Sequence, residues 1–266
     1  MGVSRLSTST FEFGSERLKT LSDKTTAPAD IFRDNSVKHF LDFESESFAD
    51  SVGSLSFTVG SGVKYTAGVN GTEKSAVIIP NEFARADTSN TLSGSGAMSY
   101  SLWTYINSVS GTHRAPTRQL VLGVGSFGTN NFNIDLEANV YDTTRQAPNN
   151  QGFSNEYGIH YWGNGVTFGK KVIYDEWVHI VFSYDGGGTL SSSSCRMWIN
   201  GKGPYLPNRS FTATIATNYR INIGRRTYPD NSFDLPMNGK VDKIRIFNKA
   251  LTAAEAIALY NNGVAI

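Results

Sequence analysis

WVHIVFSYDGGG, at residues 177–188, begins the part of this chain from which its architecture can be read. Successive side chains of residues 177–184 point to opposite faces of a strand, and both faces are largely apolar, which indicates a strand buried on both sides. The Asp-Gly pair at 185–186 predicts a turn, so CRMWI at 195–199 is expected to form the second arm of a hairpin. The Asn-Gly pair at 200–201 predicts another turn, because Asn and Gly tolerate the positive φ that such turns need.

The end of the chain predicts one more strand and then a short helix. VDKIRIF at 241–247 has the composition of a strand. Thr252 is followed three residues later by Glu255, which is the capping box of a helix start. Leu251 is placed to act as a hydrophobic staple, and Gly263 to end the helix. One short helix therefore closes a chain made otherwise of strands.

This order of strand, turn, strand, turn, strand and capped helix resembles the laminin G-like branch of the concanavalin A-like lectin/glucanase superfamily. The likeness continues more weakly upstream, through HFLDFE at 39–44, VKY at 63–65 and MSYSLW at 98–103, and it covers residues 38–263. The resemblance implies an all-β fold, a two-sheet antiparallel jelly-roll β-sandwich with a short C-terminal helix. Membership of this superfamily implies binding more often than catalysis.

Composition agrees with one large sandwich and disfavours several classes of partner. The 266 residues are 39% hydrophobic and 12% aromatic, enough for a substantial core. A net charge of +1 gives no global field for nucleic acid or an anionic membrane. No apolar run approaches the roughly 20 residues of a membrane span, and the first residues lack the apolar core of a secretory signal peptide. We therefore expect neither a nucleic-acid partner nor a membrane span.

Residues 1–37 differ from the rest in composition. Ser, Thr, Lys and Asp dominate this segment, and its apolar residues are isolated, so it does not bury enough apolar area to fold alone. We predict an extended N-terminal arm at 1–37 and a sandwich domain at 38–266. The arm is expected either to wrap its own sandwich or, as we prefer, to contact a neighbouring subunit, which points to an oligomer or a larger particle.

GVGSFG at 123–128 has the form of a dinucleotide-binding fingerprint. Such a fingerprint needs a helix to begin at the glycine loop, so that the helix N-terminus faces the pyrophosphate. Here the chain continues with the alternation of a strand. We interpret the motif as a glycine-rich β-turn.

NIDLE at 133–137 resembles the E-I-D-I-E strand of the retaining β-glucanases of the same superfamily. That resemblance implies a nucleophilic glutamate at the first position and an acid/base glutamate at the last. Asp135 and Glu137 match, but Asn133 stands where the nucleophile should be, and an amide does not form the glycosyl ester. An inverting mechanism would need a second carboxylate that sequence does not locate. We therefore expect no enzyme and no catalytic residue, and we interpret the two acids as solvent-facing.

One structural calcium site is implied by the resemblance. Many relatives hold a calcium ion between the opening and closing strands, and Asp242 falls where they often carry an acid. The alternative is a solvent-facing or salt-bridged strand aspartate. No other cofactor is expected. The four histidines lack zinc spacing, and the single cysteine, Cys195, is expected to be a buried thiol.

Aromatic faces and planar polar groups recognise sugars, and one segment offers both. YGIHYWGNG at 157–165 predicts a strand with two such residues on one face. With loop residues added, the candidate glycan site consists of Tyr141, Arg145, His160, Trp162, Arg225, Arg226 and Tyr228. The alternatives are core aromatics and, for the arginine pair, a subunit contact.

Two functional classes follow from these observations. The preferred one is a non-enzymatic structural or attachment protein of a large assembly, such as a phage virion decoration, fibre or tail component. Its arm would bind other subunits at the surface of a virion or another extracellular particle, and its sandwich would display a face for a cell-surface glycan. The alternative is a free carbohydrate-binding lectin module. A glycoside hydrolase of the β-glucanase type ranks below both.

Overall fold

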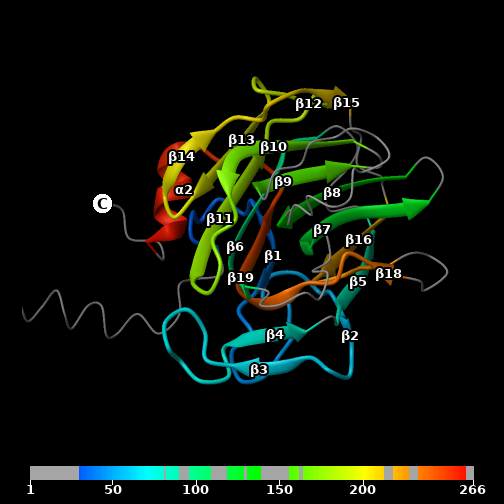
Figure 1. Ribbon diagram of the computed structural model, residues 1–266, viewed down its shortest axis with the longest axis vertical. Helices are drawn as coiled ribbons and strands as arrows, with labels where there is room; N and C mark the ends of the chain where they lie inside the picture. The colour runs from blue at the N-terminus through cyan, green and yellow to red at the C-terminus, as the bar shows by residue number, and fades with distance from the viewer. Residues whose placement is uncertain are drawn as a thin grey trace, which may run out of the picture.

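Two antiparallel sheets pack face to face, and one short helix lies outside the first of them (Figure 1). The structure is a computed structural model that describes residues 30–80, 82–89, 96–108, 119–128, 131–138, 156–161, 164–212, 218–227 and 233–261. Within these ranges no helix has the length and apolar character of a membrane span. The predicted all-β sandwich with a short C-terminal helix is confirmed.

The eight-stranded sheet contains the strands read from the C-terminal signature. Its order is β14-β13-β11-β6-β19-β4-β3, and β1 also pairs with β19. The strands are β1 (Val37–Leu41), β3 (Lys64–Thr66), β4 (Ala76–Pro80), β6 (Met98–Ile106), β11 (Trp177–Tyr184), β13 (Cys195–Ile199), β14 (Lys202–Tyr205) and β19 (Asn238–Phe247).

The seven-stranded sheet has the order β10-β9-β8-β7-β16-β5-β2. Its strands are β2 (Thr58–Val59), β5 (Ala84–Ser89), β7 (Gln119–Gly128), β8 (Asn131–Ala138), β9 (Glu156–Tyr161), β10 (Asn164–Lys171) and β16 (Asn218–Ile223). Two short ribbons accompany the sheets, β12 (Thr189–Leu190) with β15 (Phe211–Thr212) and β17 (Arg226–Thr227) with β18 (Phe233–Asp234). The glycine motif at 123–128 is the end of β7 itself rather than a turn, and strand β8 follows it instead of a helix.

The predicted hairpin is present as the pair β11 and β13. Ile180 lies opposite Ile199 and Tyr184 opposite Cys195, and the connection between the two strands includes β12. Asn200 and Gly201 have φ values of 50° and 70°, as the predicted turn requires. Cys195 is free and buried, as expected.

The main core lies between the sheets. From the seven-stranded sheet, one cross-strand row of buried side chains is Val166, Ile159, Leu136, Leu122 and Ile223. From the eight-stranded sheet, Tyr100, Leu102, Ile180 and Phe182 face them. β11 is buried on both faces because its alternate residue Val181 belongs to a second cluster on the outer side of the same sheet.

Helix α2 (Ala253–Tyr260) covers that second cluster. Its N-cap is Thr252, and the capping box with Glu255 is complete. Leu251 and Ala256 are both buried in the cluster, in agreement with the predicted staple. The helix has Asn261 as its C-cap, and the predicted stop at position 263 lies outside the described residues.

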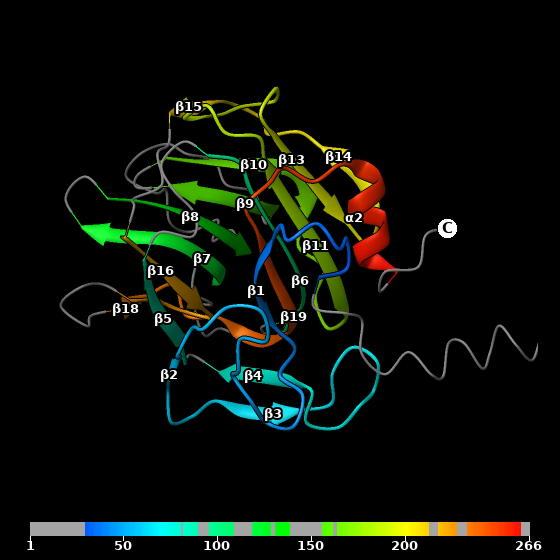
Figure 2. The ribbon, with the colours of Figure 1, turned by 180° about the vertical axis from the view of Figure 1, so that it is seen from behind.

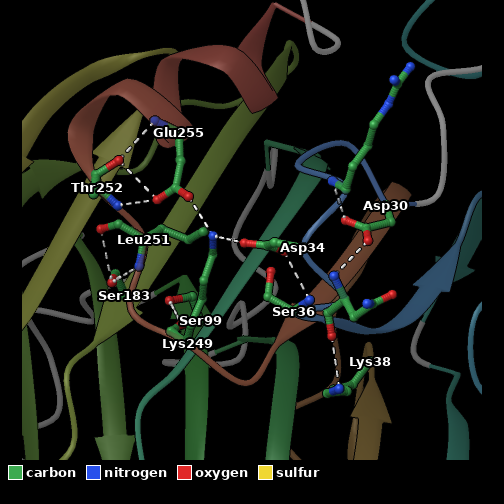
Figure 3. Close-up of polar contacts among 12 residues, drawn as sticks. Asp30, Asp34, Ser36, Lys38, Ser99, Ser183, Lys249, Leu251, Thr252 and Glu255 are labelled. Atoms are coloured by element: carbon green, nitrogen blue, oxygen red, sulfur yellow. Dashed lines mark hydrogen bonds and ion pairs between the residues drawn. The ribbon is translucent and has the colours of Figure 1, made fainter.

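The described part of the predicted arm, residues 30–37, packs on its own sandwich. Ile31 and Phe32 contact the second cluster, and the rings of Phe32 and Phe247 lie 5.7 Å apart. Lys249 binds Asp34 on one side and Glu255 on the other (Figure 3). We call these three side chains the terminal clasp. Residues 1–29 lie outside the described part of the chain, so their contact with another subunit stays a prediction.

Candidate functional site

Register places the glucanase-like residues on the outer face of the seven-stranded sheet. Leu136 of β8 is buried in the core, so its neighbours Asp135 and Glu137 belong by strand alternation to the opposite face. Asp135 lies opposite His160 of β9 on one side and opposite Gly123 of β7 on the other. Two segments that the sequence singled out separately, 133–137 and 157–165, are therefore adjacent in the sheet.

Three register rows cross this outer face. The central row is Gly165, His160, Asp135, Gly123, Asn222 and Arg85, the second is Asn133, Gly125, Arg220 and Asp87, and the third is Thr167, Gly158 and Glu137. We call these rows the polar face. The glycines among the polar residues carry no side chain, which is the pattern found where a ligand approaches a sheet closely.

Three residues of the polar face on three different strands are buried. Glu137 of β8 is only 1% exposed, and Asn222 of β16 and Thr167 of β10 are buried as well. The interpretation of the strand acids as solvent-facing is thus wrong for Glu137, which lies in an interior strand between Leu120 and Gly158. The face is more open at Asp87 of β5, which binds Arg220 and whose side chain is 69% exposed.

The predicted glycan site is placed only in part. Arg225 and Arg226 follow β16 directly, and Arg226 is buried rather than part of a solvent-exposed rim. His160 lies in β9, with Asp135 opposite it. Tyr141, Arg145, Trp162 and Tyr228 lie outside the described residues, so the site as a whole stays a prediction.

The strand predicted over 157–165 is instead a hairpin. β9 ends at Tyr161 and β10 begins at Asn164, and these two residues pair with each other. Trp162 lies between these two strands and outside the described residues, so its expected place on the face of His160 stays a prediction.

Asp242 occupies a buried position at an irregularity of β19. Its side chain accepts a hydrogen bond from the Val69 N–H at Oδ2, 3.0 Å away, and within the described residues Oδ1 has no hydrogen-bond partner. Burial raises the pKa of Asp242 to about 7, and the nearby Glu44 adds to the rise, while the Val69 N–H and Lys243 oppose it. The alternative of a solvent-facing or salt-bridged aspartate is therefore wrong, since the residue is 0% exposed and forms no ion pair with a described residue.

An unpartnered buried carboxylate oxygen fits a metal ligand, but the side chains around Asp242 do not complete a calcium site. Calcium takes six to eight oxygens, and no group of three or more His, Cys, Asp or Glu side chains in the described ranges is arranged to hold a metal ion. Backbone carbonyl oxygens would have to supply the rest. Calcium at Asp242 stays a prediction.

We expect Asp242→Asn to raise the melting temperature near pH 8 in EDTA. The pKa of the folded carboxyl lies above its ordinary value of 3.8, so the stability that it provides is complete below that value and is lost as pH rises through about 7. Asparagine keeps an oxygen that accepts from the Val69 N–H, and it does not titrate. The change in unfolding free energy with pH should therefore be smaller in the variant, by about 2–4 kcal/mol. Calorimetry at pH 5 to 8 measures this difference.

The same measurement with millimolar calcium separates the two interpretations of Asp242. If calcium binds there, it stabilises the natural protein and leaves Asp242→Asn unchanged. Equal melting temperatures with calcium and with EDTA in both proteins would refute the calcium prediction.

Sequence reasoning missed a second buried carboxylate, Asp50. Its side chain lies 2.7 Å from Nδ1 of His39 and accepts hydrogen bonds from the backbone N–H groups of Phe40 and Gly53. It joins the turn after β1 to β1 itself. The sequence signal for Asp50 was the turn composition of residues 50–53. Its pairing with His39 was not visible, because the two residues are eleven positions apart.

Comparison with known proteins agrees with the fold described above. The profile of the concanavalin A-like lectin/glucanases superfamily matches residues 80–257, whereas no curated protein sequence matches significantly. Among solved structures, domain 4 of AbnA, a GH43 extracellular arabinanase from Geobacillus stearothermophilus, in complex with arabinotriose, has a TM-score of 0.60 at 19% identity, covering 85% of this chain and 98% of that domain.

Two toxin binding domains share the fold. That of Paraclostridial Mosquitocidal Protein 1 has a TM-score of 0.57 at 13% identity, over 85% of this chain and 52% of the other. That of botulinum neurotoxin serotype G has a TM-score of 0.53 at 15% identity, over 84% of this chain and 50% of the other. This chain thus spans about half of each toxin domain, and at these identities the likeness is one of fold. Because the family profile covers more than half of its length, the chain belongs to the concanavalin A-like lectin/glucanase superfamily, with a laminin G-like domain.

Proposed function

We propose that this protein is a non-catalytic attachment protein, whose polar face binds a glycan and whose N-terminal arm joins it to a larger assembly such as a phage virion. The observation that carries the proposal is the adjacency of His160 and Asp135 in the central row of the polar face. By register the two residues are Cα partners on neighbouring strands, and histidine and aspartate are residue types that bind sugar hydroxyl groups as donor and acceptor. The likeness to an arabinanase domain solved with arabinotriose and to two toxin binding domains supports a binding role.

The residue at the nucleophile's position argues against glycoside hydrolysis. A retaining enzyme needs a nucleophilic carboxylate about 5–5.5 Å from its acid/base, and the residue at the nucleophile's position, 133, is an asparagine. Asn133→Glu would therefore be required for retaining chemistry and would still not be sufficient for it. A reducing-sugar assay on arabinan and on β-glucan is expected to show no release by the purified protein.

The described end of the arm, residues 30–37, and the polar face lie on opposite sides of the sandwich. The terminal clasp holds residues 30–37 beside helix α2, on the outer side of the eight-stranded sheet, whereas the polar face is the outer side of the other sheet (Figures 1 and 2). This separation suits an attachment protein, because a sandwich bound to a particle through one sheet leaves the outer side of the other sheet free for a receptor.

Deleting residues 1–29 tests the assembly part of the proposal. Residues 30–37 are kept, because Ile31 and Phe32 pack on the second cluster and Val37 begins β1. We expect the full chain to form oligomers in light scattering after gel filtration, and the shortened chain to be a monomer with an unchanged melting temperature. The same oligomeric state for both chains would contradict the assembly role.

A glycan array with both chains tests the binding part. Arabinotriose and longer arabinan fragments belong among the probes, since one protein of the same fold was solved with arabinotriose. If the shortened chain binds a glycan and both chains have the same oligomeric state, the free lectin module is favoured. Absence of binding to every probe by both chains would contradict the glycan role.

A further inference from the structure

A buried histidine lies where helix α2 meets the eight-stranded sheet. His179 of β11 is 1% exposed, and its Nε2 lies 2.9 Å from the hydroxyl of Ser101. The ring of Trp103 lies 5.0 Å from the imidazole, and that of Tyr260, the last residue of the helix, lies 5.8 Å away. The C-terminal turn of the helix therefore closes over His179.

The surroundings of His179 oppose a positive charge. Burial is the larger cause and Arg245 the second, and together they lower the pKa of His179 to about 3. Arg245 is itself buried and pairs in register with Ser101, the hydrogen-bond partner of the histidine. Within the described residues, Nδ1 of His179 has no hydrogen-bond partner.

The other groups around the imidazole do not compensate for a charge. Asn200 accepts a hydrogen bond from the backbone N–H of His179 and, like Trp103, carries no charge. Tyr260 contributes a neutral phenol. Asp242 is separated from His179 by strand β6, because Trp103 of that strand is the register partner of both residues. The two aromatic rings favour a cation by their π-faces. Burial and Arg245 outweigh this effect of the rings, because the imidazole is almost completely removed from water and lies near the positive charge of Arg245.

Helix α2 is attached differently from the segment that precedes it. Ser99 donates a hydrogen bond to the carbonyl of Lys249, and the N–H of Leu251 donates to the hydroxyl of Ser183 (Figure 3). These bonds fix the chain to the sheet up to Leu251. Among the described residues, 253–260 form no hydrogen bond to a strand, and the helix is held by the packing of its apolar side chains and by Glu255 of the terminal clasp.

We propose that helix α2 is an acid-released latch, in which protonation of His179 drives the helix off the eight-stranded sheet while both sheets stay folded. The proton binds far better once the helix has lifted and water reaches the imidazole, so acid favours the undocked state. The ratio of undocked to docked helix should rise about tenfold for each pH unit from about 6.5 toward 3. Undocking would uncover Trp198 and Val181 of the second cluster.

The terminal clasp titrates in a lower range than the latch. Burial opposes ionisation of Asp34, but the hydrogen bond from Lys249 outweighs it and lowers the pKa of Asp34 to about 2. The pKa of Glu255 is lowered in the same way. A change in helix protection above about pH 4.5 thus does not come from the clasp carboxylates. Asp242 has a pKa of about 7 and titrates in the same range, and His179→Gln separates its effect from that of His179.

Hydrogen–deuterium exchange of the full chain between pH 7 and 4.5, corrected for the intrinsic exchange rate, tests the latch. We expect amides of residues 253–260 to lose protection about tenfold per pH unit below about pH 6.5, while peptides of β6 and β11 keep theirs. His179→Gln keeps a hydrogen-bonding group for Ser101 and does not titrate, so its helix should stay protected throughout this range. Tyr260→Ala, which removes the ring over His179, should lower helix protection already at pH 7.

Three results would overturn the latch. The first is loss of protection by helix and sheet at the same pH, which is global unfolding. The second is an unchanged pH dependence in His179→Gln. The third is full protection of the helix in the natural protein down to pH 4.5. If His179→Gln fails to fold, the comparison of helix and strand peptides in the natural protein and in Tyr260→Ala still decides the matter.

Discussion

Asp50→Ala is expected to destabilise the protein by about 3–5 kcal/mol, because it leaves a set of buried donors without their acceptor. The Asp50 carboxylate lies 2.7 Å from Nδ1 of His39 and accepts from the N–H groups of Phe40 and Gly53 at 3.0 and 2.9 Å. Its side chain is 0% exposed, so alanine removes an acceptor that lies inside the protein. Alanine would break the link between β1 and the turn that follows it.

Urea denaturation and calorimetry measure the loss, which corresponds to about 10 °C in melting temperature for a domain of this size. Asp87→Ala is the matched control, since Asp87 binds Arg220 with a side chain that is 69% exposed. That substitution should cost less than about 1 kcal/mol. Equal losses from the two substitutions would contradict the structural role of Asp50.

Asp50 should also contribute to acid sensitivity. Burial opposes its ionisation, but hydrogen bonds from His39 and from backbone N–H groups hold its pKa below the ordinary 3.8. The stability that the ionised carboxylate provides is therefore present above that value and is lost as pH falls below it. Asp50→Ala should remove this part of the acid transition.

Asp135→Ala is expected to weaken glycan binding by tenfold or more, because a hydrogen bond to a charged group contributes about 1.5–3 kcal/mol. By register Asp135 lies in the central row of the polar face, between His160 and Gly123. Titration calorimetry with arabinotriose, and with the strongest ligand from the array, measures the effect. Melting temperature serves to show that the variant is folded.

Asp185→Ala is the control for this experiment. Asp185 is exposed and lies in the connection that follows β11 of the other sheet, so its loss should leave binding unchanged. If Asp135→Ala binds as well as the natural protein does, the polar face is not the glycan site.

The fold was predictable from sequence where the pattern is local. The alternation of 177–184 and the capping box at Thr252 each determine a structure within a few residues, and both predictions are confirmed. Errors occur where the backbone departs from a simple period. β1 was placed at 39–44 but ends at Leu41, because Phe43 adopts a φ of 58° that its apolar character does not reveal.

The candidate site was less predictable, since it depends on which strands become neighbours. The sequence identified Asp135 and His160 separately, and only the pairing of β8 with β9 places them side by side. The burial of Glu137 likewise follows from its interior strand and not from the acidic pattern around it. Asp242 was recognised by its place in a motif, yet its raised pKa results from surroundings contributed by distant segments.

The pairing of β1 with β19 has a consequence for modular architecture. Val37 lies opposite Phe247, so the first and the last strand of the sandwich are neighbours in one sheet. A unit with adjacent entry and exit can be grafted into a loop of a host protein, or circularly permuted, without cutting either sheet.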